Sequence, residues 1–365
     1  MNDVDHPVVA QWLRVAGSFC DARLLRASGR RRAFGGCTRY EVDTVDVSAR
    51  ACFARPDRLF WRTNDWLQVH SLGQLLHHAR SSGFDPDVLH GHFAAASRSL
   101  AATGRKLGIP VVISEHSSAL TGGNAAKPMT RVRFEATKRA YEAAQLVLPV
   151  SQFLADRIRD AGFVTPLAVV PNPIDTKRFF PSETCDPNRI IVAGRLDPVK
   201  RLDLALRALA MVRGDRPMTT LVFAGLGPER SRLEQVAAEL GLAGSVTFAG
   251  GLTPDALAGE MRRAAVLLSA SVVETFGVVA AEALSAGCRV VVTPDTAISE
   301  LAPEPHVFVA QGSTPRMIAD ALVQALSLPN VDRQQRHDHV HERYSIEAVA
   351  SRLSEIYRCV TSAVV

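Results

Sequence analysis

The segment from residue 266 to residue 292 constrains the fold most, because it predicts a strand, a loop, a helix and another strand in direct succession. An apolar run at residues 266–268 leads into it, and a second run at residues 289–292 leads out of it. Between them, Glu274 falls in the loop and Glu282, eight positions later, falls within the helix. Alternating strands and helices are typical of a parallel sheet covered by helices.

The loop of this segment has the composition of a site for a phosphorylated sugar. Phe276 and Gly277 lie just before the helix, where backbone N–H groups and the helix dipole favour phosphate. Glu274 and Glu282 could then accept hydrogen bonds from hydroxyl groups at the two ends of such a ligand. Taken alone, a loop glutamate is more often solvated and a helix glutamate more often lies on the surface, and both interpretations stay open at this point.

Short apolar runs alternate with segments of helical spacing along most of the chain, which predicts an α/β protein with two parallel sheets. Residues 40–48 alternate polar and apolar side chains and predict an extended arm. Ser151 is a predicted N-cap for the helix that follows it. The predicted strands are residues 22–25, 88–89, 110–113, 146–150, 190–192, 220–223, 246–248, 266–268, 290–292 and 307–309. The principal predicted helices are residues 66–80, 93–107, 131–144, 152–161, 202–212, 230–239 and 346–359.

Composition fits an enzyme of two domains and argues against several other classes of protein. A chain of 365 residues exceeds what one hydrophobic core normally serves, and 47% hydrophobic residues suffice for two buried sheets. No apolar run reaches the roughly 18 residues of a membrane span, and residues 1–6 are unlike a signal peptide. Six scattered cysteines without a C-x-x-C pair predict no disulfide framework or zinc site and suit a reducing cytoplasm. No nucleic-acid-binding module is expected, and no nucleic acid partner.

Five segments occur in the order and spacing of a known enzyme family. They are residues 170–179 with a Pro-Asn-Pro turn, 192–200 with Gly-Arg and a later lysine, 223–228 and 246–250 with strand-end glycines, and 271–287 with the two glutamates. Together they resemble the retaining glycosyltransferases of family 4, which have the GT-B fold. One segment alone would be weak evidence, because Gly-rich turns occur in many α/β proteins.

The resemblance implies two doubly wound, Rossmann-like domains that face a cleft. It places an N-terminal acceptor-side domain at residues 1–168 and a C-terminal domain for the nucleotide sugar at residues 169–345. The last helix, in residues 346–365, would cross back onto the first domain, with Ile356 and Tyr357 as anchors. A ligand should lie outside the carboxyl ends of the strands, facing the other domain.

The same resemblance implies the donor site. Arg195 and Lys200 would both reach the donor diphosphate, on which negative charge grows in the transition state. Glu274 would hold hydroxyls of the donor sugar, and Glu282 would hold the ribose. The alternative interpretation is that Arg195 and Lys200 are ordinary surface cations and that the glycines only form turns. The other predicted donor-binding residues are Gly194, Gly225, Gly227, Gly250, Thr275, Phe276 and Gly277.

Histidines at two strand ends predict the acceptor side. His116 resembles the family's catalytic-side histidine and would face the donor sugar from the first domain, while His92 lies at the preceding strand end. A buried structural histidine is the alternative interpretation of His116. His90 and His92 could form an H-x-H metal pair, but no third ligand has matching spacing, so no metal is predicted. The predicted catalytic residues are His116, Arg195, Lys200 and Glu274.

These assignments predict a retaining hexosyltransferase that moves a sugar from a UDP- or GDP-linked donor to a glycan or lipid-linked acceptor. Cell-surface polysaccharide or glycolipid biosynthesis is the expected setting. No metal or other cofactor is expected, because cationic side chains would serve the diphosphate. Two alternatives stay open, namely a nucleotide-sugar-binding protein without turnover and a GT-B epimerase that acts on the nucleotide sugar itself.

Basic residues cluster in two places, although the net charge is only +5. One cluster lies within residues 26–32, and the other comprises Arg131, Arg133, Lys138 and Arg139. The ordinary interpretation is a solvated surface. The alternative is a surface for anionic lipid, to which each basic group adds about 1 kcal/mol. That alternative would bring a cytoplasmic enzyme to the inner face of the plasma membrane as a peripheral protein.

The start of the chain departs from the family pattern. A family member opens with an apolar strand and a Gly-rich loop, whereas residues 6–13 already read as the end of that loop and the first helix. The first domain is therefore expected to lack its first strand, which leaves neighbouring backbone groups of the sheet unpaired. We expect a strand of about five or six residues to be encoded upstream of Met1, the alternative being a degenerate relative.

Overall fold

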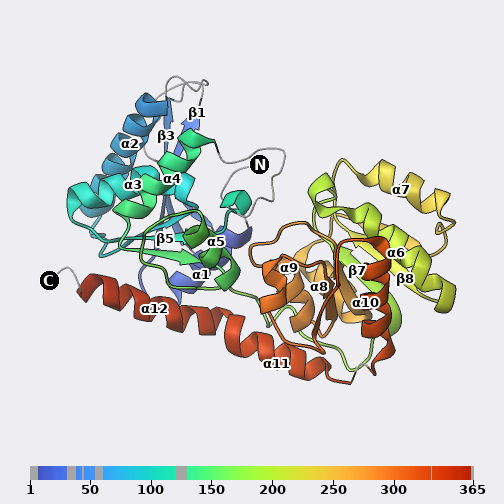
Figure 1. The fold of residues 1–365 in the computed structure, drawn as a ribbon. Coiled ribbons are helices and arrows are strands. Elements are labelled where there is room, and N and C mark those ends of the chain that lie inside the picture. The colour runs from blue at the N-terminus through green and yellow to red at the C-terminus, as the bar shows by residue number, and fades with distance from the viewer. Residues whose placement is uncertain are drawn as a thin grey trace.

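The protein consists of two α/β domains that lie side by side, as the computed structural model shows (Figure 1). Two consecutive helices near the C-terminus run along one edge of the molecule, from the second domain to the first. The predicted fold class, two Rossmann-like domains with parallel sheets, is confirmed. The structure describes residues 7–30, 38–42, 45–53, 61–120, 130–329 and 331–362.

The second domain is built on a six-stranded parallel sheet in the order β12-β11-β10-β7-β8-β9. Its central strands are covered on both faces, which explains why they read as continuous apolar runs in the sequence. All six strands predicted for this part of the chain are present. They are β7 (Asp186–Ala193), β8 (Thr220–Ala224), β9 (Val246–Gly250), β10 (Ala264–Ser269), β11 (Arg289–Val292) and β12 (Val307–Val309).

Helices cover both faces of this sheet and bury two separate hydrophobic clusters. One cluster joins α6, α7 and α10 to the side chains on one face, and the other joins α8 and α9 to the side chains on the opposite face. Thr253 and Thr314 cap α8 and α10, as expected for residues that can accept a bond from the third N–H of a helix. The helices are α6 (Leu202–Asp215), α7 (Arg230–Glu239), α8 (Pro254–Arg263), α9 (Val278–Ser285) and α10 (Pro315–Ser327).

The strand order reverses between β7 and β10, which are neighbours in the sheet. Ile191 of β7 pairs with Leu267 of β10, so the two chains leave the sheet side by side. The segments that follow, residues 194–200 and residues 270–277, begin at this switch point. Ligands of doubly wound sheets bind at such a point. The topology therefore brings two of the predicted motifs to one place.

The strands of the first domain fall into two separate three-stranded sheets. One has the order β4-β5-β6 and is parallel, and the other has the order β1-β3-β2. Among the described strands, none joins the two sheets. The strands are β1 (Arg23–Arg30), β2 (Thr38–Val42), β3 (Val45–Phe53), β4 (Leu89–His92), β5 (Val111–Glu115) and β6 (Leu146–Pro149).

Two expectations for this region need correction. Residues 40–48 do not form a single extended arm, because β2 and β3 pair antiparallel with Val42 opposite Val45. Pairing satisfies backbone N–H and C=O groups that a lone arm would leave open. The strand expected at residues 22–25 continues as β1 to Arg30, through its basic residues, because it pairs with β3 over its whole length.

The helices predicted at residues 93–107, 131–144 and 152–161 begin and end within one residue of those positions, whereas the one predicted at residues 66–80 begins five residues earlier, at Trp61. Pro7 opens α1, where its missing N–H costs nothing. Ser151 caps α5 as predicted, with the Leu154 N–H donating to Ser151 Oγ at 3.0 Å. The helices are α1 (Pro7–Gly17), α2 (Trp61–Ser81), α3 (Ala94–Leu107), α4 (Arg131–Ala143) and α5 (Gln152–Asp160).

The C-terminal helices link the two domains. Helix α11 (Arg333–Tyr344) packs on α9 in the second domain, and α12 (Ile346–Ser362) packs on α1 in the first. The Tyr357 hydroxyl lies 2.6 Å from His90 Nδ1 in β4, and Ile356 packs against the buried cluster around Trp12. The predicted crossing of the last helix and both of its anchors are therefore present.

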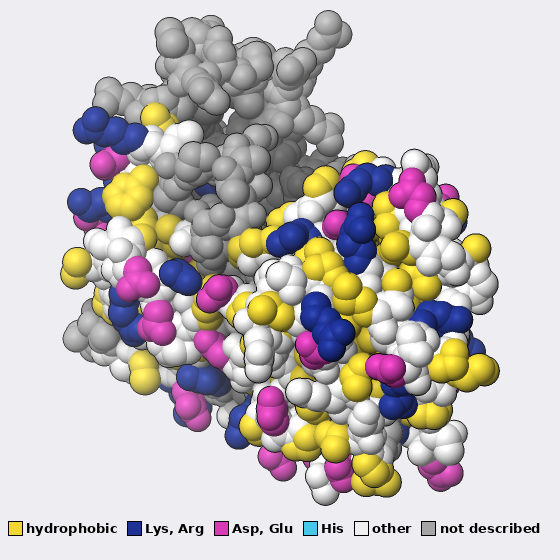
Figure 2. All heavy atoms as spheres, turned by 45° about the vertical axis from the view of Figure 1, so that its right-hand side comes forward, with side chains coloured by type: hydrophobic (Ala, Val, Ile, Leu, Met, Phe, Trp, Pro, Cys, Tyr) yellow, Lys and Arg dark blue, Asp and Glu magenta, His cyan; other side chains and the backbone are white. Residues whose placement is uncertain are grey.

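The face of the second domain that comes forward in Figure 2 carries a mixed surface. Lys and Arg side chains alternate there with Asp, Glu and hydrophobic side chains, without a large patch of one sign. The small positive net charge is thus not concentrated on that face. In the described part of the chain, no helix is both long and apolar enough to cross a membrane.

Candidate active site

Two predicted residues of opposite charge meet at the switch point of the second domain. Lys200 ends the short 3₁₀ helix η4 (Pro198–Lys200) after β7, and Glu274 lies in the loop between β10 and α9. The Lys200 ammonium group donates to Glu274 Oε1, and both side chains are partly buried. A charged pair in this position can exchange partners with a phosphate and with hydroxyl groups of a ligand.

Arg195, the other predicted cation, pairs with a neighbour of its own turn. Its Nε donates to Asp197 Oδ2 at 2.7 Å and its Nη2 to Asp197 Oδ1 at 3.2 Å. The hydrogen bonds to this carboxylate raise the pKa of Arg195, and the guanidinium lowers the pKa of Asp197. Three quarters of the Arg195 side chain is exposed, so this cation is accessible to a ligand from solvent.

The predicted glycines lie where two backbone turns approach closely. Gly194 N donates to Ala224 O at 2.9 Å, which brings the turn after β7 against the turn after β8. A Cβ atom on Gly225 would lie 1.8 Å from Gly194 O, so only glycine fits there. Gly227 similarly faces Leu196 O. The close packing of the two turns therefore requires glycine at these positions, independently of the predicted approach to a nucleotide. Gly250 ends the neighbouring strand β9.

The loop before α9 is fixed by its own residues and by the first domain. Gly277 has φ 85°, and a Cβ atom on it would lie 2.4 Å from Ile298 Cγ1. Phe276 is buried and meets the ring of Tyr344 edge-on at 5.6 Å. Thr275 Oγ1 donates to the main-chain oxygen of His116 at 2.9 Å. This bond sets the loop against the first domain.

Glu282 lies within α9 as predicted, and burial raises its pKa to about 8. Arg178 lowers this pKa and Asp175 raises it, both acting through their charge. A carboxyl group held in this state can hydrogen-bond a ribose hydroxyl as donor or acceptor. Arg178 itself pairs with Asp175 and Asp255.

Three histidines of the first domain form a stack at the ends of β4 and β5. His92 Nδ1 lies 3.1 Å from His116 Nε2, with ring centroids 5.3 Å apart, and His90 stacks on His92 at 4.8 Å. The edge of Trp12 meets all three rings. Burial, followed by the charges of His92 and His116, lowers the pKa of His90 well below its usual value. Among the described residues, no three His, Cys, Asp or Glu side chains are placed so that they could hold one metal ion, and this includes the three stacked histidines.

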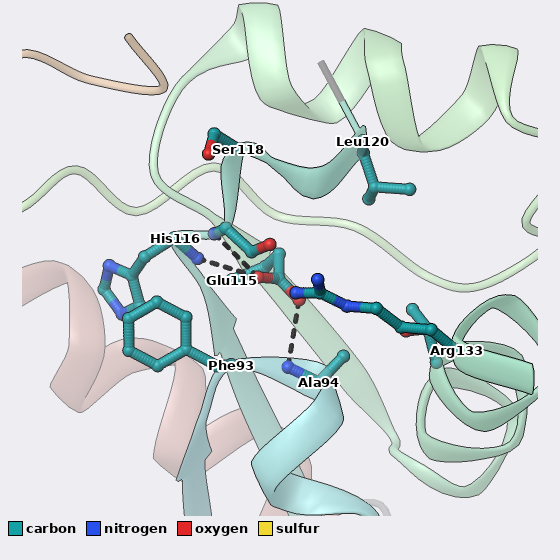
Figure 3. A pocket seen from close by; sticks show the side chains of 9 residues that line it. Phe93, Ala94, Glu115, His116, Ser118, Leu120 and Arg133 are labelled. Carbon is teal, nitrogen blue, oxygen red and sulfur yellow. Dashed lines mark hydrogen bonds between the residues drawn. The ribbon is translucent and has the colours of Figure 1, made fainter. Parts of the chain in front are cut away.

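A cavity of about 300 Å³ opens beside His116 at the carboxyl end of β5. Its floor is Glu115, which accepts from the N–H groups of Ala94, His116 and Ser117 and from the Tyr141 hydroxyl. Burial raises the pKa of Glu115, and these donors oppose the rise. Figure 3 shows the Glu115 carboxylate with its N–H donors as the base of the cavity.

The rim of this cavity carries one cation and several hydroxyl groups. Figure 3 shows Arg133 reaching from α4 toward Glu115, with the rings of Phe93 and His116 on the other side of that carboxylate. Ser117, Ser118 and Thr137 add hydroxyls to the lining. Phe93 has φ 63°, a conformation that costs a non-glycine residue roughly 1–3 kcal/mol and concentrates at functional sites.

Sequence reasoning missed several residues of this region. Glu115 and Arg133 line the cavity, and the place of Glu115 beside His116 at a strand end was the signal that could have drawn attention to it. His90 was considered only as a metal ligand, although its ring belongs to the stack. No signal in the sequence pointed to Glu300, which bonds across the domain boundary.

Two family models match successive parts of the chain. The model of group 1 glycosyl transferases matches residues 173–340, and that of glycosyltransferase family 4 matches residues 32–178. The D-inositol 3-phosphate glycosyltransferase of Acidothermus cellulolyticus is 31% identical over 56% of this chain, which spans about half, 51%, of that relative. A GDP-mannose-dependent alpha-(1-6)-phosphatidylinositol dimannoside mannosyltransferase of Mycobacterium tuberculosis is 29% identical over 68% of each chain.

Solved structures share the whole fold. Sucrose-phosphate synthase of Thermosynechococcus elongatus superposes with a TM-score of 0.77 at 18% identity, over 98% of this chain and 93% of that one. Anabaena HepE in complex with UDP and glucose gives 0.73 at 16%, over 96% and 95%. Such low identities speak for the fold alone. With the two family models and the motifs at the switch point, they show that the chain belongs to the family 4 glycosyltransferases of the GT-B fold.

Proposed function

We propose that the protein is a retaining glycosyltransferase that moves a sugar from a UDP- or GDP-linked donor to a glycan or lipid-linked acceptor. The observation that carries the proposal is the contact of Lys200 with Glu274 at the switch point, next to Thr275, which bonds the main chain of His116. Family membership and relatives named as sugar transferases support it. Polysaccharide or glycolipid biosynthesis at the cell surface is the proposed setting.

The proposed chemistry follows from the charge that develops during transfer. When the bond from the anomeric carbon to the diphosphate breaks, positive charge grows on the sugar and negative charge on the leaving phosphate. Lys200 would exchange Glu274 for the phosphate, and Arg195 would turn from Asp197 to the same group. Glu274 would then accept from the sugar hydroxyls. Because two cations serve the diphosphate, the proposal includes no metal or other cofactor.

A transfer assay tests the proposal and separates it from its alternatives. Purified protein is incubated with radiolabelled UDP- and GDP-sugars and a lipid or glycan extract, and the product linkage is examined by NMR. Transfer with retained anomeric configuration is expected. Inverted configuration, an altered free nucleotide sugar, or binding without turnover would each contradict the proposal, the last two in favour of an epimerase or a binding protein.

For the acceptor we propose a polyol that carries a phosphate group, bound in the cavity beside His116. Arg133 supplies a cation for the phosphate, while Ser117 and Thr137 supply partners for hydroxyl groups. The names of the relatives point the same way, since they act on D-inositol 3-phosphate or on phosphatidylinositol derivatives. The negative charge of Glu115 at the floor is partly offset by the four hydrogen bonds that its oxygens accept.

Two arginines of α4 give a matched test of this acceptor class. Arg133 lines the cavity, whereas Arg131, two residues earlier and also exposed, does not. Arg133→Ala should raise the KM for a phosphorylated acceptor about tenfold or more, as expected for a lost charge-assisted bond worth ~1.5–3 kcal/mol. Arg131→Ala should leave this KM unchanged when the acceptor is water-soluble, because no membrane contact then takes part in binding. Equal effects of both variants would mean that general charge, not the cavity, binds the acceptor.

We also propose that α4 contacts anionic lipid at the inner face of the plasma membrane, where this cytoplasmic protein would bind peripherally. Arg131, Arg133, Lys138 and Arg139 are exposed on it beside the exposed Val132. The first basic cluster, in residues 26–32, lies outside the residues whose side chains the structure describes. Co-sedimentation with phosphatidylserine vesicles that weakens with salt is expected, and equal binding to neutral vesicles would contradict this surface.

A further inference from the structure

The loop that carries Glu274 is tied to the first domain through Thr275. Thr275 Oγ1 donates to His116 O at 2.9 Å, at the end of β5. Ser151 Oγ donates to Thr275 O at 2.7 Å, at the end of β6. The hydroxyl and the main-chain carbonyl of Thr275 therefore both bond to the other domain, although Ser151 lies 124 residues away in the sequence.

A second point of contact lies at the start of α5. Glu300, in the 3₁₀ helix η5 (Ala297–Glu300) of the second domain, accepts from the Gln152 N–H at 2.9 Å and from the Phe153 N–H at 2.5 Å. The Leu154 N–H bonds Ser151 Oγ instead. Of the four N–H groups that a helix start leaves without an internal partner, two are thus satisfied from the other domain. The negative charge of Glu300 also suits the helix dipole.

Apolar packing crosses this boundary, because one buried cluster includes Leu154 of the first domain and Phe276 and Ile298 of the second. A cavity of about 410 Å³ lies directly beside the two polar contacts, and its lining comes from both domains and from the linker residue Pro171. Hydrophobic contacts have no preferred direction whereas hydrogen bonds do, so the polar contacts define the geometry in which the domains meet. Polar groups at the ends of β5, β6 and η5 are therefore placed to control how closely the domains approach.

We propose that Ser151 and Glu300 are positioning residues that latch the two domains together and thereby hold the Glu274 loop against the first domain. Ser151 serves two purposes at once, because a hydroxyl can accept from Leu154 N–H while it donates to Thr275 O. Its donated bond fixes the residue next to Glu274. For catalysis the inference rests on the proposed function, whereas the latch itself is a property of the fold.

Three replacements of Ser151 and Glu300 separate the latch from simple helix capping. Ser151→Asp keeps an excellent N-cap for α5 but lacks the hydroxyl hydrogen that bonds Thr275 O. Glu300→Gln removes the charge and turns one acceptor into a donor that faces an N–H group. Ser151→Thr keeps both functions and serves as the control for Ser151→Asp. Glu304→Gln, at an exposed carboxylate of the same segment, is the control for Glu300→Gln.

Hydrogen exchange reports the latch without any need for activity. The reporter of the Glu274 loop is the Ala297 amide, which donates to Glu274 O at 3.0 Å. In Ser151→Asp, the Ala297 amide should exchange faster than in the wild-type protein, while the Leu154 amide stays protected. In Glu300→Gln, the Gln152, Phe153 and Ala297 amides should exchange faster. Ser151→Thr and Glu304→Gln should behave as wild type. Unchanged exchange at Ala297 in both latch variants would overturn the proposal.

The kinetic readout distinguishes a latch from a merely structural role. Each latch variant should lower kcat/KM for transfer about fivefold, the fold-change that corresponds to loss of a hydrogen bond worth ~1 kcal/mol. Affinity for the free nucleoside diphosphate should change much less, because Lys200 and Arg195 are untouched. Faster exchange in a protein that shows no transfer would refute the proposed function and leave the latch standing. Normal exchange in a variant that has lost transfer would refute the latch and leave the proposed function standing.

Discussion

At the scale of single residues, the candidate site holds its charges in pairs that a donor would have to exchange. Lys200 is engaged by Glu274, and Arg195 is engaged by Asp197. Each pair keeps a cation oriented and prevents two carboxylates and two cations from standing uncompensated near the switch point. A diphosphate arriving there would satisfy both cations, and its sugar would satisfy Glu274.

The first prediction concerns these two cations. Lys200→Ala and Arg195→Ala should each lower turnover by about 10²–10³, because a donor that stabilises developing negative charge is worth roughly 2.7–4 kcal/mol in the transition state. Lys106→Ala, at an exposed lysine of α3, is the control for loss of one positive charge. Steady-state rates and melting temperatures measure the effect. Wild-type rates in both folded variants would show that Lys200 and Arg195 do not stabilise the leaving diphosphate.

The second prediction concerns the pH dependence of nucleotide binding. Burial holds the pKa of Glu282 at about 8, so this carboxyl group is protonated at neutral pH in the structure. The neutral carboxyl group can hydrogen-bond one ribose hydroxyl, but only the carboxylate accepts with both oxygens from two hydroxyls, so tight binding below pH 8 requires loss of a proton. Affinity for the nucleoside diphosphate should therefore rise by up to about tenfold per pH unit until pH 8 and level off above it.

Calorimetry between pH 6 and pH 9 measures this dependence, and Glu282→Gln is the direct control. The variant should bind more weakly above pH 8 and lose the pH dependence. Glu274→Ala should keep it, since that residue is assigned to the sugar. A Glu282→Gln variant with the wild-type pH profile would show that another group titrates. Equal losses of affinity in Glu282→Gln and Glu274→Ala would show that the two glutamates do not have separate roles in binding the ribose and the sugar.

At the scale of secondary-structure elements, β4, β5 and α12 meet at the histidine stack. His90 Nδ1 lies 2.6 Å from the Tyr357 hydroxyl of α12, and His90 Nε2 lies 2.8 Å from Ser114 Oγ of β5. Trp12 of α1 reaches the same place, and its Nε1 donates to Asn172 of the linker at 3.1 Å. Four elements and the linker therefore depend on one group of rings.

The third prediction is that this group makes the fold sensitive to acid. The pKa of His90 is lowered by burial and by the neighbouring imidazoles, so the folded state does not take up the proton that the unfolded state binds below about pH 6.5. Stability should be constant above that pH and fall as the pH drops below it. Denaturant unfolding of wild type and His90→Gln at pH 8 and pH 5.5 measures the difference.

The His90→Gln variant should lose stability at pH 8, where its hydrogen bonds are poorer, but should lose less than the wild type between pH 8 and pH 5.5. Tyr357→Phe tests the link to α12 separately, since it removes one hydrogen bond and should cost about 1 kcal/mol at either pH. A wild-type acid response in the His90→Gln variant would assign the sensitivity to another group.

At the scale of the whole molecule, the sequence predicts the second domain better than the first. Strands of a sheet covered on both faces read as continuous apolar runs, so β7 to β12 could be found one by one. By contrast, β1 carries arginines, serine and glycine, and only its pairing with β3 makes it a strand. The split of the first domain into two sheets follows from such pairing.

The candidate site divides in the same way. The family resemblance predicts that Lys200 and Glu274 belong to one donor site. The structure brings the two side chains into contact, because the strands that precede them, β7 and β10, are neighbours in the sheet. The bonds from Ser151 to Thr275 and from Glu300 to α5 join residues more than a hundred positions apart. No local pattern encodes such contacts, since they depend on how the two domains approach each other.

The last prediction tests whether α12 makes the two domains unfold together. Leu353 is fully buried among side chains of the first domain, including Trp12 and Leu148, while its helix continues from α11 of the second domain. Leu353→Ala should cost ~2–5 kcal/mol, the range for a buried leucine that leaves a cavity. It should also weaken the coupling, so that calorimetry resolves an earlier transition of the first domain from a later one of the second. Ser351→Ala, exposed on the same helix, should stay within about 0.5 kcal/mol of wild type with an unchanged profile. One cooperative transition that merely shifts to lower temperature in Leu353→Ala would mean that the domain boundary around Thr275 and Glu300, not the C-terminal helix, couples the two domains.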